Sequence, residues 1–236
     1  MLISDKEILQ AIKDKEISIE PFSEGNLEPA SYDMRLGDRA IISKTVRLEE
    51  LKKQVEEKEV TEINVREKGR IVIPPGAFVL LITLEKIKIS THYAGHIGMR
   101  SYYARKGLVL LSGIQIDPGF EGHLVLGLCN LSPRSLEIGY SDPICTIELL
   151  KLSQEASRAY TSQAMIASQA MIEQKEGKIP SWDKDYLRTI ETMSISDLTM
   201  ALMTLSNNVN ELRRYILYLW IPILIAMAVS IITKFL

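Results

Sequence analysis

Two arginines, a serine and an aspartate fall within one short stretch of the chain, RSYYARKGLVLLSGIQIDPGFEG, which covers residues 100–122. Arg100 and Arg105 can each offer planar, bidentate N–H donors to phosphate oxygens, and Ser101 adds a hydroxyl. Asp117 supplies a carboxylate that can hold a sugar hydroxyl or activate a water molecule. These residue types predict a site that handles a triphosphate.

Short apolar segments separated by turn residues surround these positions. The segments IVIPPGAFVLLITL, LVLLSGIQI and HLVLGLCNL are rich in Ile, Val and Leu, and the turn signals PPG, DPGFEG and SPRS divide the region. This pattern predicts an all-β sandwich or barrel. Ahead of it, Ser4 and Glu7 form a capping box, and the apolar spacing that follows predicts a short amphipathic helix at the N-terminus.

The overall charge argues against a nucleic-acid partner. The formal net charge is −2 and charged residues make up 25% of the chain, so phosphate binding has to come from local placement of cations. A small anion is the expected partner. Cys129 and Cys145 lie in apolar, strand-like segments without metal-ligand spacing, which predicts reduced thiols in the core.

Three motifs in order give the chain a resemblance to a known family. They are IEPFSEGNLEPASYDMRLG at residues 19–37, FVLLITLEKIKI at residues 78–89, and the stretch 100–122. Together they resemble the dCTP deaminase and dUTPase superfamily over residues 1–152, and archaeal-type deaminase-like dUTPases in particular. The resemblance implies a dUTPase-like β-barrel or jelly-roll domain of the β-clip type. It also implies a homotrimer with active sites between subunits.

The resemblance assigns roles to individual residues. RSYYARKG is similar to the family pattern Arg-Ser-Ser-x-x-Arg-x-Gly, which gives Arg100, Ser101 and Arg105 to the triphosphate and leaves Tyr102 where a second serine is expected. A tyrosine places its hydroxyl far from the backbone, so one phosphate contact or subunit contact is altered. IDPGFEG is similar to the segment that carries the family's carboxylate, which makes Asp117 the expected catalytic residue.

The resemblance also implies a nucleoside pocket and a closing arm. Gly113, Ile116 and Phe120 are the expected neighbours of the nucleoside. The family's C-terminal arm uses a Tyr and a Gln, and the nearest matches are Tyr160, beside the nucleoside, and Gln163, beside the triphosphate. The Gly and Ser/Thr pattern that follows in the family is missing here, which leaves an ordinary helix as the alternative for this segment.

The position that distinguishes the two family reactions is Gly127. Family deaminases carry a glutamate there, and deamination at C4 of cytosine needs a group that activates water and moves a proton. Glycine has no carboxylate, and the zinc-deaminase pattern H-x-E with P-C-x-x-C does not occur. The favoured function is therefore hydrolysis of dUTP to dUMP and pyrophosphate, with Mg²⁺ held by the phosphates. A catalytically inactive nucleotide sensor or scaffold and a dCTP deaminase are the alternatives.

The C-terminal third differs from the rest in composition. Residues 153–186 read as an arm and linker, residues 187–214 as a coiled-coil stalk and residues 215–236 as a transmembrane anchor. A heptad seam of apolar residues continues from the stalk into the span, and the β-branched a positions with Leu at d lean toward two strands, whereas the resemblance implies three. Nineteen uncharged residues follow Arg214, and the arginine pair before them favours a cytoplasmic N-terminal domain.

Overall fold

The computed structural model describes residues 1–42, 61–160, 173–180, 203–216, 218 and 220. It divides the chain into two compact units, Met1–Ser194 and Ile195–Leu236.

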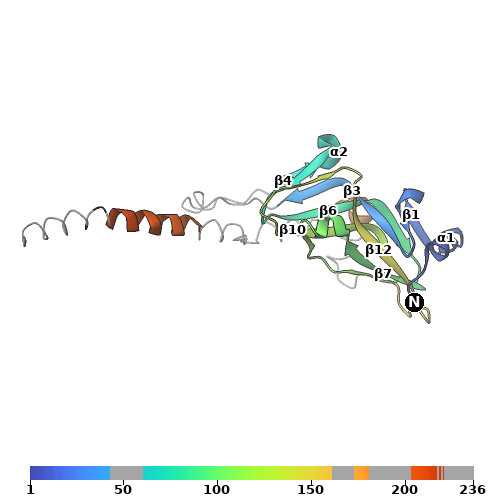
Figure 1. Cartoon of the computed structure of the whole chain (residues 1–236). Coiled ribbons are helices and arrows are strands. Elements are labelled where there is room, and N and C mark those ends of the chain that lie inside the picture. Colours follow the sequence, from blue (N-terminus) through green and yellow to red (C-terminus); the bar gives the residue numbers. More distant parts are fainter. Residues whose placement is uncertain (43–60, 161–172, 181–202, 217, 219, 221–236) are drawn as a thin grey trace, which may run out of the picture. The chain divides into compact units, whose positions relative to one another are not determined.

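The first unit is built on one curled antiparallel sheet (Figure 1), with the strand order β8-β10-β6-β3-β12-β7-β9. Its longest strands are β3 (Ser31–Ile42), β6 (Phe78–Ile89), β10 (Glu121–Asn130) and β12 (Pro143–Lys151). The shorter strands on this path are β7 (Tyr93–Met99), β8 (Leu108–Leu110) and β9 (Gln115–Ile116), and β1 (Ile17–Glu20), β2 (Leu27–Glu28) and β4 (Thr61–Asn64) pair with its members. A separate hairpin joins β5 (Arg70–Ile73) to β11 (Leu136–Gly139).

Strand β3 produces the curl because it changes partners part-way along its length. Its first half pairs with β12, through Tyr32 and Met34, and its second half pairs with β6, through Leu36 and Ala40. A strand that leaves one partner for another at an irregular point turns the corner between two layers of a folded sheet. The predicted β architecture is thus confirmed at the level of a mostly β, curled antiparallel sheet.

A four-residue link joins two edges of the curled sheet. The N–H of Leu111 donates to the Gly127 carbonyl of β10 at 2.8 Å, and the Ile97 N–H of β7 donates to the Ile114 carbonyl at 2.6 Å. The link is too short to leave much space between these edges, so the sheet approaches closure around its core.

The predicted N-terminal helix is present as α1 (Asp5–Lys13). The capping box is formed because the Ser4 backbone N–H donates to the Glu7 carboxylate at 2.9 Å. That hydrogen bond lowers the pKa of Glu7. On its inner face Ile8 and Ala11 are buried, so the helix seals one end of the core. The other helical turns are η1 (Glu24–Asn26), α2 (Val65–Lys68) and α3 (Ser101–Ala104).

A buried ion pair joins β3 to β6 inside the largely apolar core. Glu85 has no exposed side-chain surface and accepts from Arg35 twice, from the backbone N–H at 2.8 Å and from Nε at 2.5 Å. The same arginine also donates to the Pro21 carbonyl at 3.1 Å. A buried carboxylate with this many donors is compensated for its loss of water, whereas either partner alone would not be.

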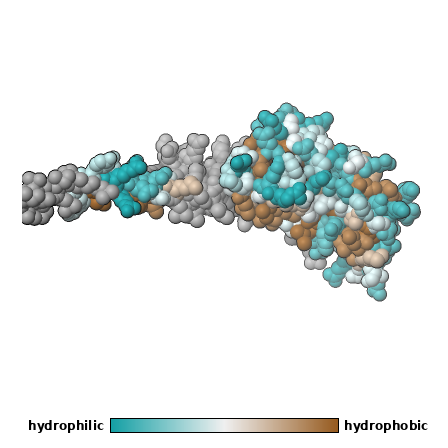
Figure 2. All heavy atoms as spheres, in the orientation of Figure 1, coloured by the Kyte–Doolittle hydropathy of each residue, from teal (hydrophilic) through white to brown (hydrophobic). Residues whose placement is uncertain are grey.

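A second apolar cluster lies apart from the main core. Ile41 and Ile82 are buried there with Ile179, which is only 2% exposed although it lies beyond the β-strands in sequence. Elsewhere on the first unit, Leu111, Ile114 and Leu131 are more than half exposed. Figure 2 shows apolar residues between polar ones on the face that it draws.

The described part of the second unit is helical over residues 203–216. Four of its apolar side chains, Leu205, Val209, Leu212 and Ile216, occupy the expected a and d positions and are 53–60% exposed. The rest of the heptad seam lies outside the described residues, as does nearly all of the predicted span 215–236. Among the residues that the structure describes, no helix is both long and apolar enough to cross a membrane.

Candidate functional site

Arg100 is held at the end of β7 by a buried carboxylate. Its guanidinium donates a charge-assisted hydrogen bond to Asp33, whose side chain is 6% exposed, while 35% of the arginine side chain remains exposed. The strand order makes this contact possible because Thr146 of β12 pairs with Asp33 on one side and with Gly98 on the other. Burial raises the pKa of Asp33, and the charge of Arg100 opposes that rise. Arg100 is therefore a positioned cation that stays accessible to a ligand.

Asp33 is a site residue that the sequence analysis did not single out. Its neighbours Tyr32 and Met34 are fully buried in the same strand. An acidic side chain between buried apolar residues has to find a cation, because an unpaired buried charge is costly. The segment SYDMRLG carries that signal, but it does not indicate which arginine pairs with Asp33.

Ser101 and Arg105 lie on the single helical turn that follows Arg100. The Arg105 N–H donates to the Ser101 carbonyl at 3.0 Å, and both side chains are exposed. Within the described part of the chain, no carboxylate lies within 4 Å of the Arg105 guanidinium. Arg105 is thus fully available to bind an anion, whereas Arg100 is only partly available because it is paired with Asp33.

Tyr102, which departs from the family pattern, is engaged by a neighbouring cation. The Lys106 ammonium donates to the Tyr102 hydroxyl at 2.5 Å and lies 3.8 Å from the ring centroid. Its neighbour Tyr103 points inward, and burial raises the pKa of Tyr103 to about 12. The substitution therefore brings an extra positive charge next to the expected phosphate contacts.

Asp117 begins the tight turn that joins β9 to β10. The turn closes through the Phe120 N–H, which donates to the Asp117 carbonyl at 3.1 Å, and Gly119 adopts a left-handed φ of 82°. One carboxylate oxygen of Asp117 accepts from Gln115 at 2.7 Å. The other oxygen accepts no hydrogen bond from any described residue and is free to bind a water or a ligand.

The expected nucleoside neighbours fall into two groups. Tyr160 lies beside the turn, because its N–H donates to the Pro118 carbonyl at 2.6 Å and its ring is 5.7 Å from the Phe120 ring. Phe120 and Ile116 are buried in the core, 9% and 1% exposed, so a ligand would meet their backbone or an edge. Gly113 is exposed on the link between β8 and β9. Gln163 lies outside the described residues.

Within one chain, the arginine and the aspartate are at opposite ends of β7. Ile116 pairs with Gly95, and Arg100 comes five residues further along that strand, about 17 Å away at the rise of an antiparallel strand. The guanidinium also turns away from β9 toward Asp33 on β3, three strands across, or roughly 14 Å at normal strand spacing. The chain alone does not bring these two groups together.

Gly127 lies on the partly exposed face of β10, where side chains of β6 fill the space beside it. A Cβ atom built on Gly127 would lie 3.1 Å from Cζ of Phe78 and 3.6 Å from Cδ2 of Leu80. The position that would carry a carboxylate is therefore bordered by an aromatic ring and a leucine. A larger side chain at Gly127 would require the Phe78 ring to move.

The described ranges contain no group of three or more His, Cys, Asp or Glu side chains arranged to hold a metal ion.

Residues 2–152 match the family described as dCTP deaminase-like. The chain belongs to this family. The relatives include the dCTP deaminase of Thermococcus kodakarensis, which is 36% identical over 146 residues, covering 62% of this chain and 83% of that protein. A dUMP-forming dCTP deaminase of Nanoarchaeum equitans is 33% identical over 170 residues, covering 65% and 85%.

Solved structures show more distant similarity. A deoxycytidine triphosphate deaminase from Agrobacterium tumefaciens has a TM-score of 0.48 at 15% identity, covering 73% of this chain and 53% of its own. A dUTPase from phage phi11 of S. aureus has a TM-score of 0.37 at 15% identity, covering 63% of this chain and 99% of its own. Membership in the dCTP deaminase-like family places the chain in deoxypyrimidine nucleotide metabolism.

Proposed function

We propose that this member of the dCTP deaminase-like family hydrolyses dUTP to dUMP and pyrophosphate. The observation that supports the proposal is Gly127 with Phe78 beside it, at the position where the family's deaminases carry a glutamate. Without that carboxylate the chain lacks the group expected to activate water for attack on the cytosine ring. The groups needed for attack on phosphorus, Asp117 and the arginines, are retained.

In the proposed reaction, Asp117 orients a water molecule and accepts its proton as the water oxygen bonds to the α-phosphorus. The bond from that phosphorus to the bridging oxygen breaks, and pyrophosphate leaves. Arg100 and Arg105 stabilise the negative charge on the phosphates, and the Ser101 hydroxyl adds a hydrogen bond. Arg100 is positioned before the substrate arrives because Asp33 holds it, while Ser101 begins α3 and Arg105 caps its end.

Mg²⁺ would be held chiefly by the triphosphate oxygens, as is common for this ion. The donor set near the turn fits such a complex, since one Asp117 oxygen is free of hydrogen bonds from described residues. When bound, the ion would neutralise charge on the phosphates.

The proposal includes an assembly, a homotrimer with shared sites. Because Arg100 and Asp117 are separated within one chain, a complete site requires the Arg100 end of one copy to meet the Asp117 turn of another. The exposed a and d side chains of residues 203–216 would support the association as a parallel coiled coil. A membrane span over residues 215–236, with the β domain on the cytoplasmic side, completes the proposed organisation.

The direct test is turnover by the full-length protein in detergent with dUTP and Mg²⁺. We expect dUMP and pyrophosphate, and we expect Asp117→Asn to reduce the rate by at least 100-fold, the usual scale for losing a general base. Lys68→Gln, at an exposed position of α2, is the control. Absence of dUMP from the wild type, or an unchanged rate in Asp117→Asn, would refute the proposal.

Deamination is tested in the same assay. If dCTP releases ammonia and that release survives replacement of both Glu121 and His123, the reasoning based on Gly127 is wrong. Because the relatives named above are dCTP deaminases, dCTP should always be run beside dUTP.

A nucleotide sensor or scaffold is the second candidate, and the Tyr102–Lys106 pair favours it. An additional cation beside the phosphate contacts strengthens binding without adding a catalytic group. Calorimetric binding of dUTP with no turnover would support the sensor. Absence of any nucleotide binding would exclude both candidates.

A further inference from the structure

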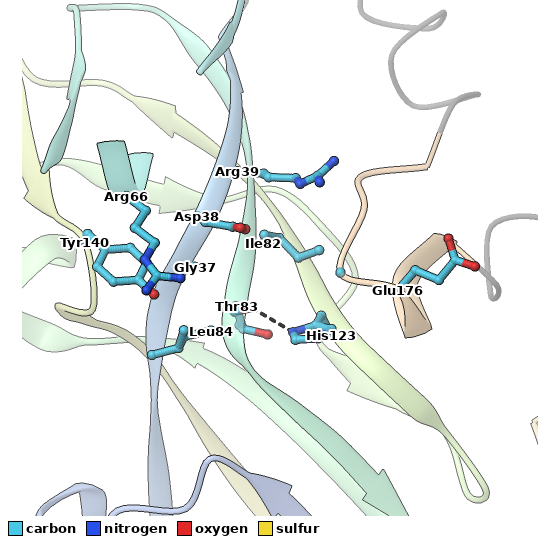
Figure 3. A pocket seen from close by; sticks show the side chains of 11 residues that line it. Gly37, Asp38, Arg39, Arg66, Ile82, Thr83, Leu84, His123, Tyr140 and Glu176 are labelled. Carbon is cyan, nitrogen blue, oxygen red and sulfur yellow. Dashed lines mark hydrogen bonds between the residues drawn. The ribbon is translucent and has the colours of Figure 1, made fainter. Parts of the chain in front are cut away.

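A pocket of about 240 Å³ lies apart from the proposed dUTP site. Its walls come from β3, α2, β6, β10, the turn after β11 and the segment 173–180 (Figure 3). None of the expected triphosphate or nucleoside residues lines it. His123, its nearest lining residue on β10, is four positions from Gly127, roughly 13 Å along an extended strand.

The pocket forms because the sheet is irregular on both sides of β6 at the same level. Pairing of β3 with β6 jumps from Leu36 opposite Thr83 to Ala40 opposite Leu81. Pairing of β10 with β6 shifts between His123 and Val125. Such bulges re-aim side chains and are over-represented next to functional sites.

The backbone around the pocket is fixed in place. Gly37 runs so close to β6 that a Cβ atom there would lie 2.8 Å from the Ile82 carbonyl oxygen. Thr83 donates to the Glu85 carbonyl and accepts from the Leu124 N–H, both at 2.9 Å. His123 Nδ1 lies 2.9 Å from the Thr83 carbonyl and must carry the hydrogen, since a carbonyl can only accept. The floor of the pocket is therefore preformed.

Two arginines from different elements line this pocket with little neutralisation. Arg66 of α2 has no carboxylate within 4 Å in the described part of the chain, and its guanidinium carbon is 5.9 Å from the Tyr140 ring centroid. Arg39 of β3 forms a long ion pair with Glu62 at 4.0 Å, and 40% of its side chain is exposed.

The two acidic residues of the pocket differ in whether a cation pairs with them. Glu176 is engaged by Lys178 at 2.6 Å, and Figure 3 shows its carboxylate directed away from the other lining side chains. Asp38 is the carboxylate that remains beside the two arginines, without an ion-pair partner among the described residues. Figure 3 shows the Arg66 guanidinium and Tyr140 on one side of β3, Arg39 extending to the other side, and Asp38 between them.

We propose that this pocket is a binding site for a phosphate monoester of a hydroxylated sugar. Arg66 would bind the phosphate through bidentate donors, the charge of Arg39 at the far side of β3 would add to the attraction, and Asp38 would accept from a sugar hydroxyl. The size limits the ligand: drug-sized ligands occupy pockets of roughly 300–1,000 Å³, so a nucleoside triphosphate is too large for this one. A sugar phosphate and a nucleoside monophosphate share the required chemistry. The site does not depend on dUTP hydrolysis.

The test is calorimetry on the full-length protein with ribose 5-phosphate, dUMP and inorganic phosphate as separate probes. We expect a sugar-bearing probe to bind more tightly than inorganic phosphate, Arg66→Gln to weaken that binding at least tenfold, and Arg39→Gln to weaken it by a smaller factor. Asp38→Asn should remove the preference for the sugar-bearing probe while phosphate binding persists. Arg134→Gln, at an exposed arginine with no carboxylate nearby among described residues, is the matched control and should bind as the wild type does.

A second arm distinguishes this pocket from the proposed catalytic site, because dUMP could bind to both. Binding that survives Arg105→Gln but is lost in Arg66→Gln supports the pocket. Binding lost in Arg105→Gln and retained in Arg66→Gln overturns it, as does the absence of binding by every probe at about 1 mM. Preference between ribose 5-phosphate and dUMP tells which source of the shared chemistry the pocket takes.

Discussion

Two inactive variants of this chain should restore activity to each other when they assemble together. Arg105→Gln removes an exposed phosphate contact, and Asp117→Asn removes the proposed base. If each site takes its arginine from one subunit and its aspartate from the next, a site is intact only where both contributors retain the required residue. In a cyclic trimer that holds both variants, one of the three sites meets this condition, whichever variant is in excess.

The expected rate is therefore about a third of the wild-type rate per trimer. The variants are co-expressed with different affinity tags, purified through both tags, and assayed for dUMP release from dUTP. Each variant alone should be close to inactive. A second mixture, of wild type with the double variant Arg105→Gln/Asp117→Asn, calibrates the result: shared sites predict about a sixth of the wild-type rate, and sites within one chain predict about half.

An inactive mixture of the two single variants, together with about half activity in the calibrating mixture, would show that the site lies within one chain. That result would refute the reasoning from strand register. The test depends on the separation of about 17 Å along β7 and the turn of Arg100 toward β3.

Three further predictions concern the core, a tyrosine and the stalk. Glu85→Gln should lower the free energy of unfolding by about 3 kcal/mol in chemical denaturation, because it leaves Arg35 without its buried counter-charge. Glu137→Gln, in the exposed pair with Arg70, should lower it by under ~1 kcal/mol. Equal losses in the two variants would contradict this. Because burial raises the pKa of Tyr103 from 10 to about 12, the folded state keeps a proton that the unfolded state loses, so stability should fall as pH rises from 10 to about 12. Tyr103→Phe should remove that part of the fall and the exposed Tyr102→Phe should not, as measured by denaturation at each pH. Leu212→Asn should lower the oligomer mass in detergent by light scattering, whereas Asn207→Ala on the opposite helix face should leave it unchanged; a trimer unaffected by Leu212→Asn would show that the stalk does not hold the copies together.

The sequence predicted the helices and strands better than it predicted the contacts between them. The N-terminal helix followed from Ser4 and Glu7, because capping is local, and the strands followed from short segments rich in Ile, Val and Leu between turn signals. The partner of Arg100 did not follow, because Asp33 is distant in sequence and meets the arginine only through the order β3-β12-β7. Strand order depends on long-range pairing that short patterns do not encode.

The pocket lined by Arg39 and Arg66 could not be predicted from the sequence either. Gly37, Arg39 and Arg66 carry no recognisable motif, and the pocket exists because register shifts occur on both sides of Thr83. Bulges add residues to one strand without changing its composition, so they leave little trace in the pattern. By contrast, the absence of a carboxylate at Gly127 could be seen in the sequence, and the structure added that the Phe78 ring lies beside this position.

The burial of Ile179 bears on where the β domain can be cut. The family match ends at residue 152, yet Ile179 covers Ile41, Leu80 and Ile82 on the outer side of the sheet. Burying one isoleucine is worth about 1.5–3 kcal/mol, and removing it would also uncover the side chains beneath. A truncated chain that stops at residue 152 should therefore be prone to precipitate, and a stop codon placed after Pro180 should give the better-behaved protein for crystallisation.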